Sequence, residues 1–482
     1  MFEQIKRLGT DTAIYGVSTV VARLLNFVLV PLYTNLLSPA EFGIQANIYA
    51  SVALIIVFYS FGMESSYFRF AAIKEIGTEK DNFSTPFISI FLVSLFFSIV
   101  LAVFAVPLTT IFQIDVSLYN LLYYTAGILF FDAIAMIPFA SLRLQRKAKF
   151  FAAAKVINIV ATIILNIITV LYLRWGLEGI FFSNLCASAL TFFILLPSTL
   201  SQLQFSIHKN LFVELLKFGL PIMPVGLSGV LLQIVDRPIL VYLMGAAANG
   251  IYQANFRLGI FMALINGMFE FAWRPFFLSH AKDPNAKQLF SRVMTYYLAG
   301  SFALFLLLSF FIPDLVQYKI FGRYIIHPRY WEGLNIVPFV MLSYIFSGIG
   351  TNLNAGIQIE KKTMYLLPTS FSGSITKIVL TFALVPIFGI MGAAYATIIG
   401  YAVVAISLFV VTKKFYPIEY EYKRIAKIIF LTAAAFILFQ TMQLNILQKT
   451  LLFGVWCGGL FAVKFFTTGE LQRIRNLFGK FS

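Results

Sequence analysis

Two arginines lie deep inside long apolar segments of this 482-residue sequence, and they are its clearest candidates for chemistry. Arg23 lies about 20 Å from the inner end of segment 10–32, and Arg257 lies about 15 Å from the outer end of segment 246–271, at ~1.5 Å per helical residue. A charge at the bilayer centre costs about 2.5–3.5 kcal/mol, so each should face a cavity or a partner. Because a guanidinium can hold phosphate oxygens bidentately, the two arginines indicate a pyrophosphate site at mid-depth.

Each arginine shares one helical face with other polar residues, at spacings of three or four positions. These neighbours are Thr12, Tyr15, Thr19 and Asn26 for the first arginine, and Asn249 and Gln253 for the second. We therefore include Asn26 and Gln253 among the candidate substrate-binding residues. Arg69, which ends the second apolar segment, could bind phosphate in an inward-open state or could snorkel to the inner interface.

The alternative role for these arginines is structural. Arg23 could pair with Glu64 or Asp132. Arg257 could instead pair with Asp236 or Glu270. Glu64 and Asp132 therefore stand as candidate cavity or ion-coupling charges.

A second pair of charged residues could couple transport to an ion gradient. Asp236 is a candidate site for Na⁺ or H⁺ coupling, and a local ion pair or a helix cap is its alternative role. Lys377 lies on a polar stripe of segment 363–386 and could act as a built-in cation for Asp236, which would leave no need for bound sodium. It could also add to the cationic field of the cavity, or only hold the helices together.

The sequence offers no metal-ligating or catalytic constellation. Its three histidines, His208, His280 and His327, fall in predicted loops without ligand partners at metal spacing. Cys186 and Cys457 fall within apolar segments and are expected to pack there. We expect no cofactor, no catalytic residues and no enzymatic activity.

Long apolar segments must position these charges. With 60% hydrophobic and 12% charged residues, the chain lacks the polar surface of a soluble protein, which carries about 25% charged residues. Fourteen segments are long enough to cross a bilayer as helices. They are 10–32, 41–66, 83–108, 117–141, 150–173, 177–197, 213–235, 246–271, 293–313, 332–354, 363–386, 389–411, 424–441 and 446–466. The prediction is an all-α polytopic membrane protein of 14 transmembrane helices.

Basic residues set the orientation. With the N-terminus inside, the inner segments hold 26 of the 36 Lys and Arg residues and the outer segments hold six. This bias predicts that both termini are cytoplasmic. It also accounts for the net charge of +16 without nucleic-acid binding. The basic tail from Gly469 to Ser482 is expected to be an amphipathic anchor on anionic lipid.

An internal repeat predicts two lobes. Residues 31–44 carry Pro31, Leu36, Gly43 and Ile44, and residues 238–251 carry Pro238, Leu243, Gly250 and Ile251 at the same spacing. Six spans per repeat give parallel halves with a binding site between them. We expect an N-terminal lobe (1–198), a cytoplasmic linker (199–212), a C-terminal lobe (213–412), and two extra helices with the basic tail (413–482).

The chain resembles the polysaccharide and oligosaccharide flippases of the multidrug/oligosaccharidyl-lipid/polysaccharide exporter superfamily. The resemblance rests on several motifs in order: Phe218-Gly-Leu-Pro-Ile-Met-Pro224, Asp236-Arg-Pro238, Trp273-Arg-Pro275, Tyr330-Trp331, Lys361-Lys-Thr363 and Gly389-Ile-Met-Gly392. It implies two six-helix lobes in a V around a central cavity. It also implies alternating access, which moves an isoprenoid-pyrophosphate-linked glycan (undecaprenyl-type) to the outer leaflet.

The resemblance further implies a multi-pass protein of the bacterial inner membrane, working as a monomer beside glycosyltransferases and a glycan polymerase. Two alternatives share the fold: a cation-coupled exporter of small drugs, whose cavity should be acidic, and a peptidoglycan-precursor flippase. A membrane-embedded glycan polymerase would need carboxylates in a sizeable outer loop. The longest outer loop, 314–330, holds three basic residues and one acidic residue.

Overall fold

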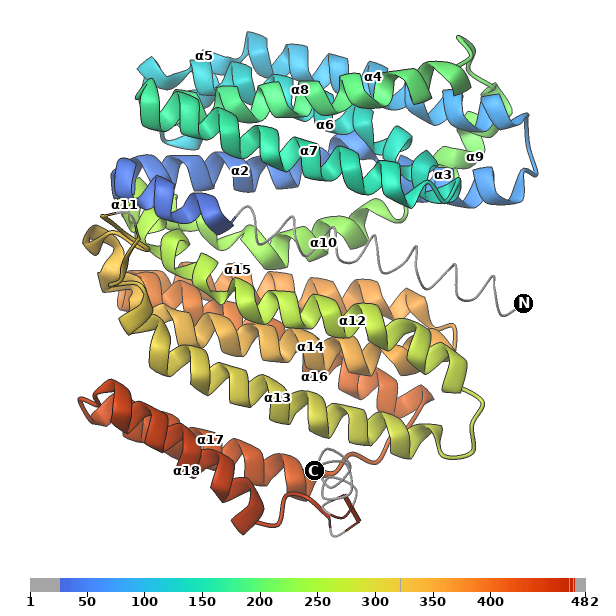
Figure 1. Ribbon diagram of the computed structural model, residues 1–482. Coiled ribbons are helices and arrows are strands. Elements are labelled where there is room, and N and C mark those ends of the chain that lie inside the picture. The colour runs from blue at the N-terminus through green and yellow to red at the C-terminus, as the bar shows by residue number, and fades with distance from the viewer. Residues whose placement is uncertain (1–26, 321, 468, 471, 473–482) are drawn as a thin grey trace. The chain divides into compact units, whose positions relative to one another are not determined.

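The computed structural model describes residues 27–320, 322–467, 469–470 and 472, and nearly all of them are helical (Figure 1). The α-helices after the segment Phe27–Leu36 are α2 (Pro39–Ser60), α3 (Met63–Ile73), α4 (Glu79–Val103), α5 (Ala105–Phe112), α6 (Asn120–Leu144), α7 (Ala148–Asn166), α8 (Gly176–Gln202), α9 (Lys209–Gly219), α10 (Met223–Ile234), α11 (Asp236–Phe256), α12 (Ile260–His280), α13 (Ala286–Leu315), α14 (Val337–Ile359), α15 (Leu366–Phe388), α16 (Ile390–Phe415), α17 (Tyr422–Thr441) and α18 (Ile446–Ala462). The predicted helical class is confirmed.

Short irregular elements connect the helices. They are the 3-10 turns η1 (Val116–Leu118), η3 (Arg257–Gly259), η4 (Pro328–Ile336) and η5 (Thr363–Tyr365), and the π-helical turn η2 (Ile167–Tyr172), which ends α7. Strands β1 (Lys319–Ile320) and β2 (Arg323–Tyr324) pair antiparallel, with Lys319 opposite Tyr324.

Eleven helical stretches of the described residues are long and apolar enough to cross a membrane. One of them, Met223–His280, has 58 residues, more than twice the ~20 that one crossing needs. It is broken at Gly245, whose φ of 84° and ψ of 170° are not helical. The chain is therefore a multi-pass membrane protein, and the count of fourteen spans stays a prediction.

The segment between the predicted seventh and eighth spans differs from expectation. We expected residues 236–245 to form an outer loop, but α11 begins directly at Asp236 and the chain stays helical up to Gly245. Pro238 does not prevent this, because a proline in the first turn of a helix removes no internal hydrogen bond. The turn is reduced to the single glycine.

Several helices begin with side chains that satisfy their free N–H groups. Ser38 and Glu41 form a capping box at α2, and Pro39 occupies the first turn, where proline fits best. Thr78 with Asp81 does the same at α4, and Asn445 with Gln448 does so at α18. These caps fix where the spans start.

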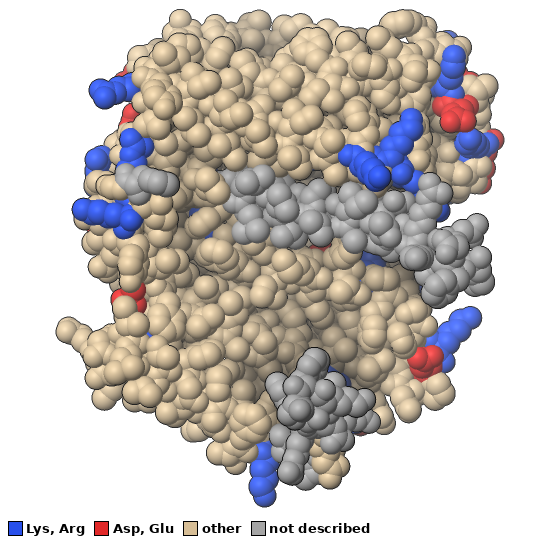
Figure 2. All heavy atoms as spheres, viewed as in Figure 1, with Lys and Arg blue, Asp and Glu red and all other residues tan. Residues whose placement is uncertain are grey.

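The outer surface in Figure 2 separates charged from apolar side chains. On the face in Figure 2, Lys, Arg, Asp and Glu gather near the helix ends, while the surface along α4 and α8 is formed almost wholly by other residues. Many large apolar side chains there are exposed, among them Phe96 at 62% and Phe193 at 59%. Such a surface suits the acyl chains of a bilayer.

The chain forms two compact units. Unit 1 comprises Met1–Arg257, Lys319–Ile336 and Leu366–Val403, and unit 2 comprises Leu258–Tyr318, Val337–Tyr365 and Val404–Ser482. In unit 1, α4, α6, α7 and α8 pack side by side (Figure 1), and α2 packs on α6 and on α11. In unit 2, α13 packs on α14, α17 and α18. The lobes at 1–198 and 213–412, with the linker and the end region, stay predictions.

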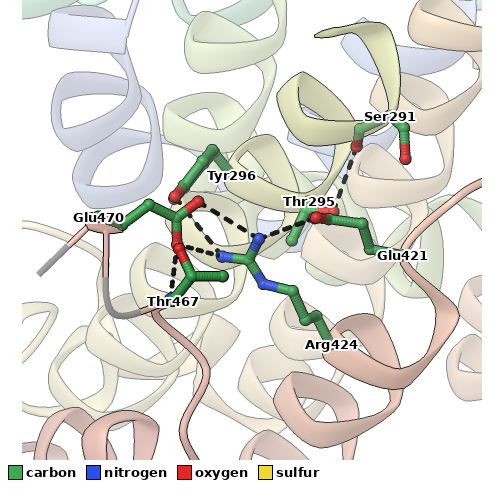
Figure 3. A network of polar contacts seen from close by, with 7 residues as sticks. All are labelled: Ser291, Thr295, Tyr296, Glu421, Arg424, Thr467 and Glu470. Carbon is green, nitrogen blue, oxygen red and sulfur yellow. Dashed lines mark hydrogen bonds and ion pairs between the residues drawn. The ribbon is translucent and has the colours of Figure 1, made fainter. Parts of the chain in front are cut away.

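A polar network in unit 2 holds the end of the described chain against α13 and α17 (Figure 3). Arg424 donates to Glu421 at 3.0 Å and to Glu470 at 3.1 Å, and its guanidinium lies 5.5 Å from the ring centroid of Tyr296. Partial burial alone would raise the pKa of Glu470, but hydrogen bonds from Tyr296 and Thr467, with the charge of Arg424, lower it to about 2. The segment is thus attached through a carboxylate that stays ionised.

Candidate functional site

Arg257 lies where α11 meets the turn η3, and it packs against α2. Its guanidinium carbon lies 4.8 Å from the centre of the Phe42 ring, a cation–π distance. Tyr33, Tyr49 and Arg237 are close enough to interact with it electrostatically. Within the described ranges no carboxylate forms an ion pair with Arg257, and neither Asp236 nor Glu270 is its partner.

Gln253 lies one helical turn before Arg257. Its side chain is buried, and its Nε2 atom has no hydrogen-bond partner among the described residues. An unmade hydrogen bond of this kind costs about 1–3 kcal/mol. The Gln253 amide therefore has a donor to spare, one helical turn from the Arg257 guanidinium.

A close approach of α2 and α11 brings this region together, and it involves the two repeats. A Cβ atom on Gly43 would lie 2.8 Å from the backbone N of Gly250, and one on Gly250 would lie 2.9 Å from the backbone N of Gly43. The same added atoms would overlap the carbonyls of Ala246 and Pro39, respectively. All of these residues are related by the repeat offset of 207 positions, so the repeats touch at equivalent places.

Side-chain hydrogen bonds reinforce that approach. Asn249 donates to the carbonyl of Gly43 at 2.9 Å, and Asn255 donates to the carbonyl of Tyr330 at 2.7 Å. The Tyr330 hydroxyl in turn donates to the carbonyl of Leu37 at 3.0 Å. The turn η4 thus connects the end of α11 to the start of α2.

Asp236 and Lys377 form an ion pair that is sealed from solvent. Lys377 Nζ lies 3.2 Å from Asp236 Oδ1, and the two side chains are 0% and 1% exposed. Lys377 also donates to the carbonyl of Leu232 at 2.9 Å, and Tyr252 donates to Asp236 Oδ2 at 2.6 Å. Among the roles considered for these two residues, the structure shows a direct ion pair between Asp236 and Lys377.

Glu64 and Asp132 both line a cavity of about 540 Å³ inside unit 1, formed by α2, α3, α6, α7 and α8. Glu64 forms an ion pair with Arg143, and the two side chains are 38% and 37% exposed. Asp132 lies about 16 Å farther along α6, eleven residues from Arg143, at ~1.5 Å per residue. It is exposed towards the cavity and attracts Lys155 of α7.

Arg143 and Lys155 belong to this site but were not among the predicted residues. Arg143 falls between the predicted spans 117–141 and 150–173, whereas it occupies the last turn of α6. Lys155 falls inside predicted span 150–173, and a charge within a span was the signal that could have identified it. Its ammonium lies 4.2 Å from the centre of the Phe139 ring.

Arg69 lies apart from these groups. It is exposed on α3, and its guanidinium carbon lies 4.5 Å from the centre of the Phe218 ring of α9. This stacked position is compatible with the interfacial role. Arg23 and Asn26 lie outside the described residues. Among the residues that the structure describes, no group of three His, Cys, Asp or Glu side chains could hold a metal ion.

Comparisons with known proteins agree with this architecture. A family model described as "Polysaccharide biosynthesis protein" matches residues 8–280. Among curated proteins, none matches the chain.

Solved structures are similar over most of the chain. The lipid II flippase MurJ in an inward closed conformation has a TM-score of 0.74 at 17% identity, covering 93% of this chain and 99% of that one. An inward-facing multidrug resistance MATE family transporter of the MOP superfamily has 0.64 at 14% identity, covering 82% of this chain and 97% of its own. A MATE transporter from Vibrio cholerae, VcmN, has 0.59 at 15% identity, covering 85% and 96%.

At these identities the solved structures establish the fold alone, while the family match spans more than half of the sequence. The prediction of family from sequence is confirmed: the chain belongs to the polysaccharide biosynthesis protein family and has the fold of MurJ and the MATE transporters.

Proposed function

We propose that this protein flips an isoprenoid-pyrophosphate-linked oligosaccharide from the cytoplasmic to the outer leaflet of the bacterial inner membrane by alternating access. The observation that carries the proposal is that Arg257 forms no ion pair with a carboxylate of the described residues. Asp236, one of the two acids considered as its partner, is paired with Lys377, and no described carboxylate pairs with Arg257. A fixed positive charge beside the spare amide donor of Gln253 suits a pyrophosphate.

The same arrangement weakens the drug-exporter alternative. A carrier of organic cations that relied on Asp236 would need this carboxylate to be accessible, but Asp236 already holds an ammonium and is closed to solvent. The accessible carboxylates of the unit 1 cavity, Glu64 and Asp132, share their cavity with the cations Arg143 and Lys155. We propose that Lys377 occupies the place of a coupling cation beside Asp236, so that transport does not use sodium at this position. Arg23 and Asn26 would complete the site from the first span, and Gln253 would donate to the same head group.

Membership of a polysaccharide biosynthesis family supports a glycan on the lipid carrier. The protein would then receive its substrate from membrane glycosyltransferases and pass it to a polymerase. A peptidoglycan-precursor flippase is the second candidate, because the lipid II flippase matches over 93% of this chain.

Deletion of the gene with staining for surface polysaccharide tests the proposal. Wild type should restore the polysaccharide, Arg257→Ala should fail to do so at an equal membrane level, and Arg257→Lys should restore part of it because it keeps the charge. Arg292→Ala, which removes an exposed arginine of α13, is the matched control and should rescue fully. Full rescue by Arg257→Ala would remove that residue from the mechanism.

Expression in a strain depleted of its lipid II flippase separates the two candidates. Growth rescue there, with no change in surface polysaccharide on deletion, would favour the peptidoglycan precursor. Increased sensitivity to cationic drugs on deletion, with normal polysaccharide, would favour the exporter.

A further inference from the structure

The cavity bounded by α2, α3, α6, α7 and α8 has a composition that the pyrophosphate site does not explain. Its volume of about 540 Å³ falls within the ~300–1,000 Å³ typical of small-molecule sites. Its charged side chains are two acids and two bases, Glu64, Asp132, Arg143 and Lys155. Their formal charges sum to zero, so the lining favours neither an anion such as pyrophosphate nor an organic cation.

The cavity is elongated along the helices. Arg143 and Glu64 lie at one end, at the last turn of α6 and the first turn of α3. Asp132 and Tyr49 lie deeper, and Asn184, Ser188 and Thr191 follow one face of α8. The wall therefore presents both donors and acceptors over about 16 Å, the rise of the eleven residues from Asp132 to Arg143 at ~1.5 Å each.

Two lining groups lack the hydrogen bonds that buried polar atoms require. The Tyr49 hydroxyl and the Arg143 Nε have no partner within the described part of the chain, although both atoms are buried. The Tyr49 ring is fixed by stacking on Phe181, at a centroid distance of 5.0 Å and an interplanar angle of 13°. Because an unsatisfied buried donor costs about 1–3 kcal/mol, these groups favour a hydrogen-bonding ligand.

We propose that this cavity is a saccharide subsite that holds sugar units of the transported glycan. This inference rests on the proposed function and adds a second contact region next to the head-group site at Arg257, with Tyr49 close to both. Neutral sugars carry many hydroxyls, each of which can both donate and accept. A net-neutral lining of carboxylates, amides, hydroxyls and basic groups can satisfy them, whereas a purely cationic lining could not.

Binding measurements on the full chain in nanodiscs test the inference with two probes. One probe is undecaprenyl pyrophosphate without sugar, and the other is the lipid-linked glycan extracted from the deletion strain. Tyr49→Phe removes a hydroxyl that has no hydrogen-bond partner among the described residues, so it should not lower stability. Asp132→Asn combined with Lys155→Gln keeps the cavity neutral and nearly the same shape.

Both variants should weaken binding of the lipid-linked glycan about fivefold to tenfold, as expected for lost hydrogen bonds, and leave the sugar-free lipid unchanged within about twofold. Tyr123→Phe, at an exposed tyrosine of α6 outside the cavity lining, is the matched control and should change neither affinity.

Equal losses for both probes, or no loss for either, would overturn the subsite while the proposed function stands. Equal binding of both probes by the wild-type protein would also overturn the subsite and leave the proposed function standing. Wild-type protein that binds neither probe would overturn the proposed function, and the subsite with it. Size-exclusion profiles identify a misfolded double variant, in which case Tyr49→Phe alone decides.

Discussion

Two regions of the molecule hold acidic and basic side chains within the helices but differ in solvent exposure. One is the cavity formed by α2, α3, α6, α7 and α8, and the other is the Asp236–Lys377 ion pair. In the cavity, Glu64 and Arg143 are more than one-third exposed, and nearby donors lack partners. At the pair, both side chains are closed to solvent, and backbone and tyrosine hydrogen bonds supplement the ion pair. The comparison teaches that an intramembrane charge is available for ligands only where the fold leaves it exposed and unsatisfied. Where it is sealed and held in an ion pair, it fixes the structure.

The largest expected effect comes from breaking the sealed pair. Lys377→Met should destabilise the protein by about 3–5 kcal/mol, because it leaves Asp236 charged, buried and unpaired. Lys155→Met, the matched change in the cavity, should cost less than about 1 kcal/mol because Lys155 is an exposed residue. Thermal unfolding in detergent measures both. Equal effects of the two substitutions would contradict the distinction between sealed and open charges.

Adding Asp236→Asn to Lys377→Met sharpens that test. The double variant removes the uncompensated charge, so it should be more stable than Lys377→Met alone. If the stability losses of the two single substitutions instead add up in the double variant, the residues do not act as a pair.

The glycine contact between α2 and α11 should give the next largest effect. Gly43→Ala and Gly250→Ala should each destabilise by about 1–3 kcal/mol or more, because the added methyl meets rigid backbone. Gly226→Ala in α10, where an added Cβ meets nothing within 4 Å, is the control and should be neutral or stabilising. The two destabilising changes should be similar in size, since the contacts are reciprocal. A neutral result at either position would show that the contact is not tight.

Glu470 and Arg424 form an intermediate case, 21% and 12% exposed. The folded pKa of Glu470, about 2, lies below the ordinary value of 4.5. Its contribution to stability is therefore complete above about pH 4.5 and is lost as the pH falls towards 2. Wild type should lose about 1 kcal/mol more than Glu470→Gln between pH 5 and pH 3, a loss discounted for exposure. Thermal unfolding over that range measures the difference, and parallel curves for the two proteins would rule out this linkage.

The smallest expected effect is that of sodium. Because Lys377 already supplies a positive charge to Asp236, exchanging NaCl for KCl at equal ionic strength should leave the unfolding temperature unchanged. If sodium raises the unfolding temperature and still does so in a variant that lacks Asp236, the sodium site lies elsewhere. If the rise disappears in that variant, sodium binds at Asp236, and the role of Lys377 as a built-in cation is contradicted.

Patterns local to one helix were predictable from the sequence, and arrangements made by several helices were not. Mean hydropathy and segment length predicted the helical class, and the spacing around Gly43 and Gly250 located two equivalent segments that do meet. The proximity of Asp236 and Lys377 could be anticipated because each is a costly charge that needs a partner. The cavity could not, since its wall needs five helices in register. The α11 start was missed because Asp236-Arg-Pro resembles a turn, yet proline is tolerated in a first helical turn.

The reciprocal glycine contact also restricts how the two halves of the molecule can change over evolutionary time. If the chain arose by duplication and fusion of a six-span ancestor, most positions of one copy could diverge without regard to the other. Residues 43 and 250 could not, because each meets the other copy's counterpart, and a substitution in either copy would distort both. Symmetry would thus persist longest where the copies touch, while specialisation, such as an open cavity in one half and a locked ion pair in the other, would accumulate away from the axis.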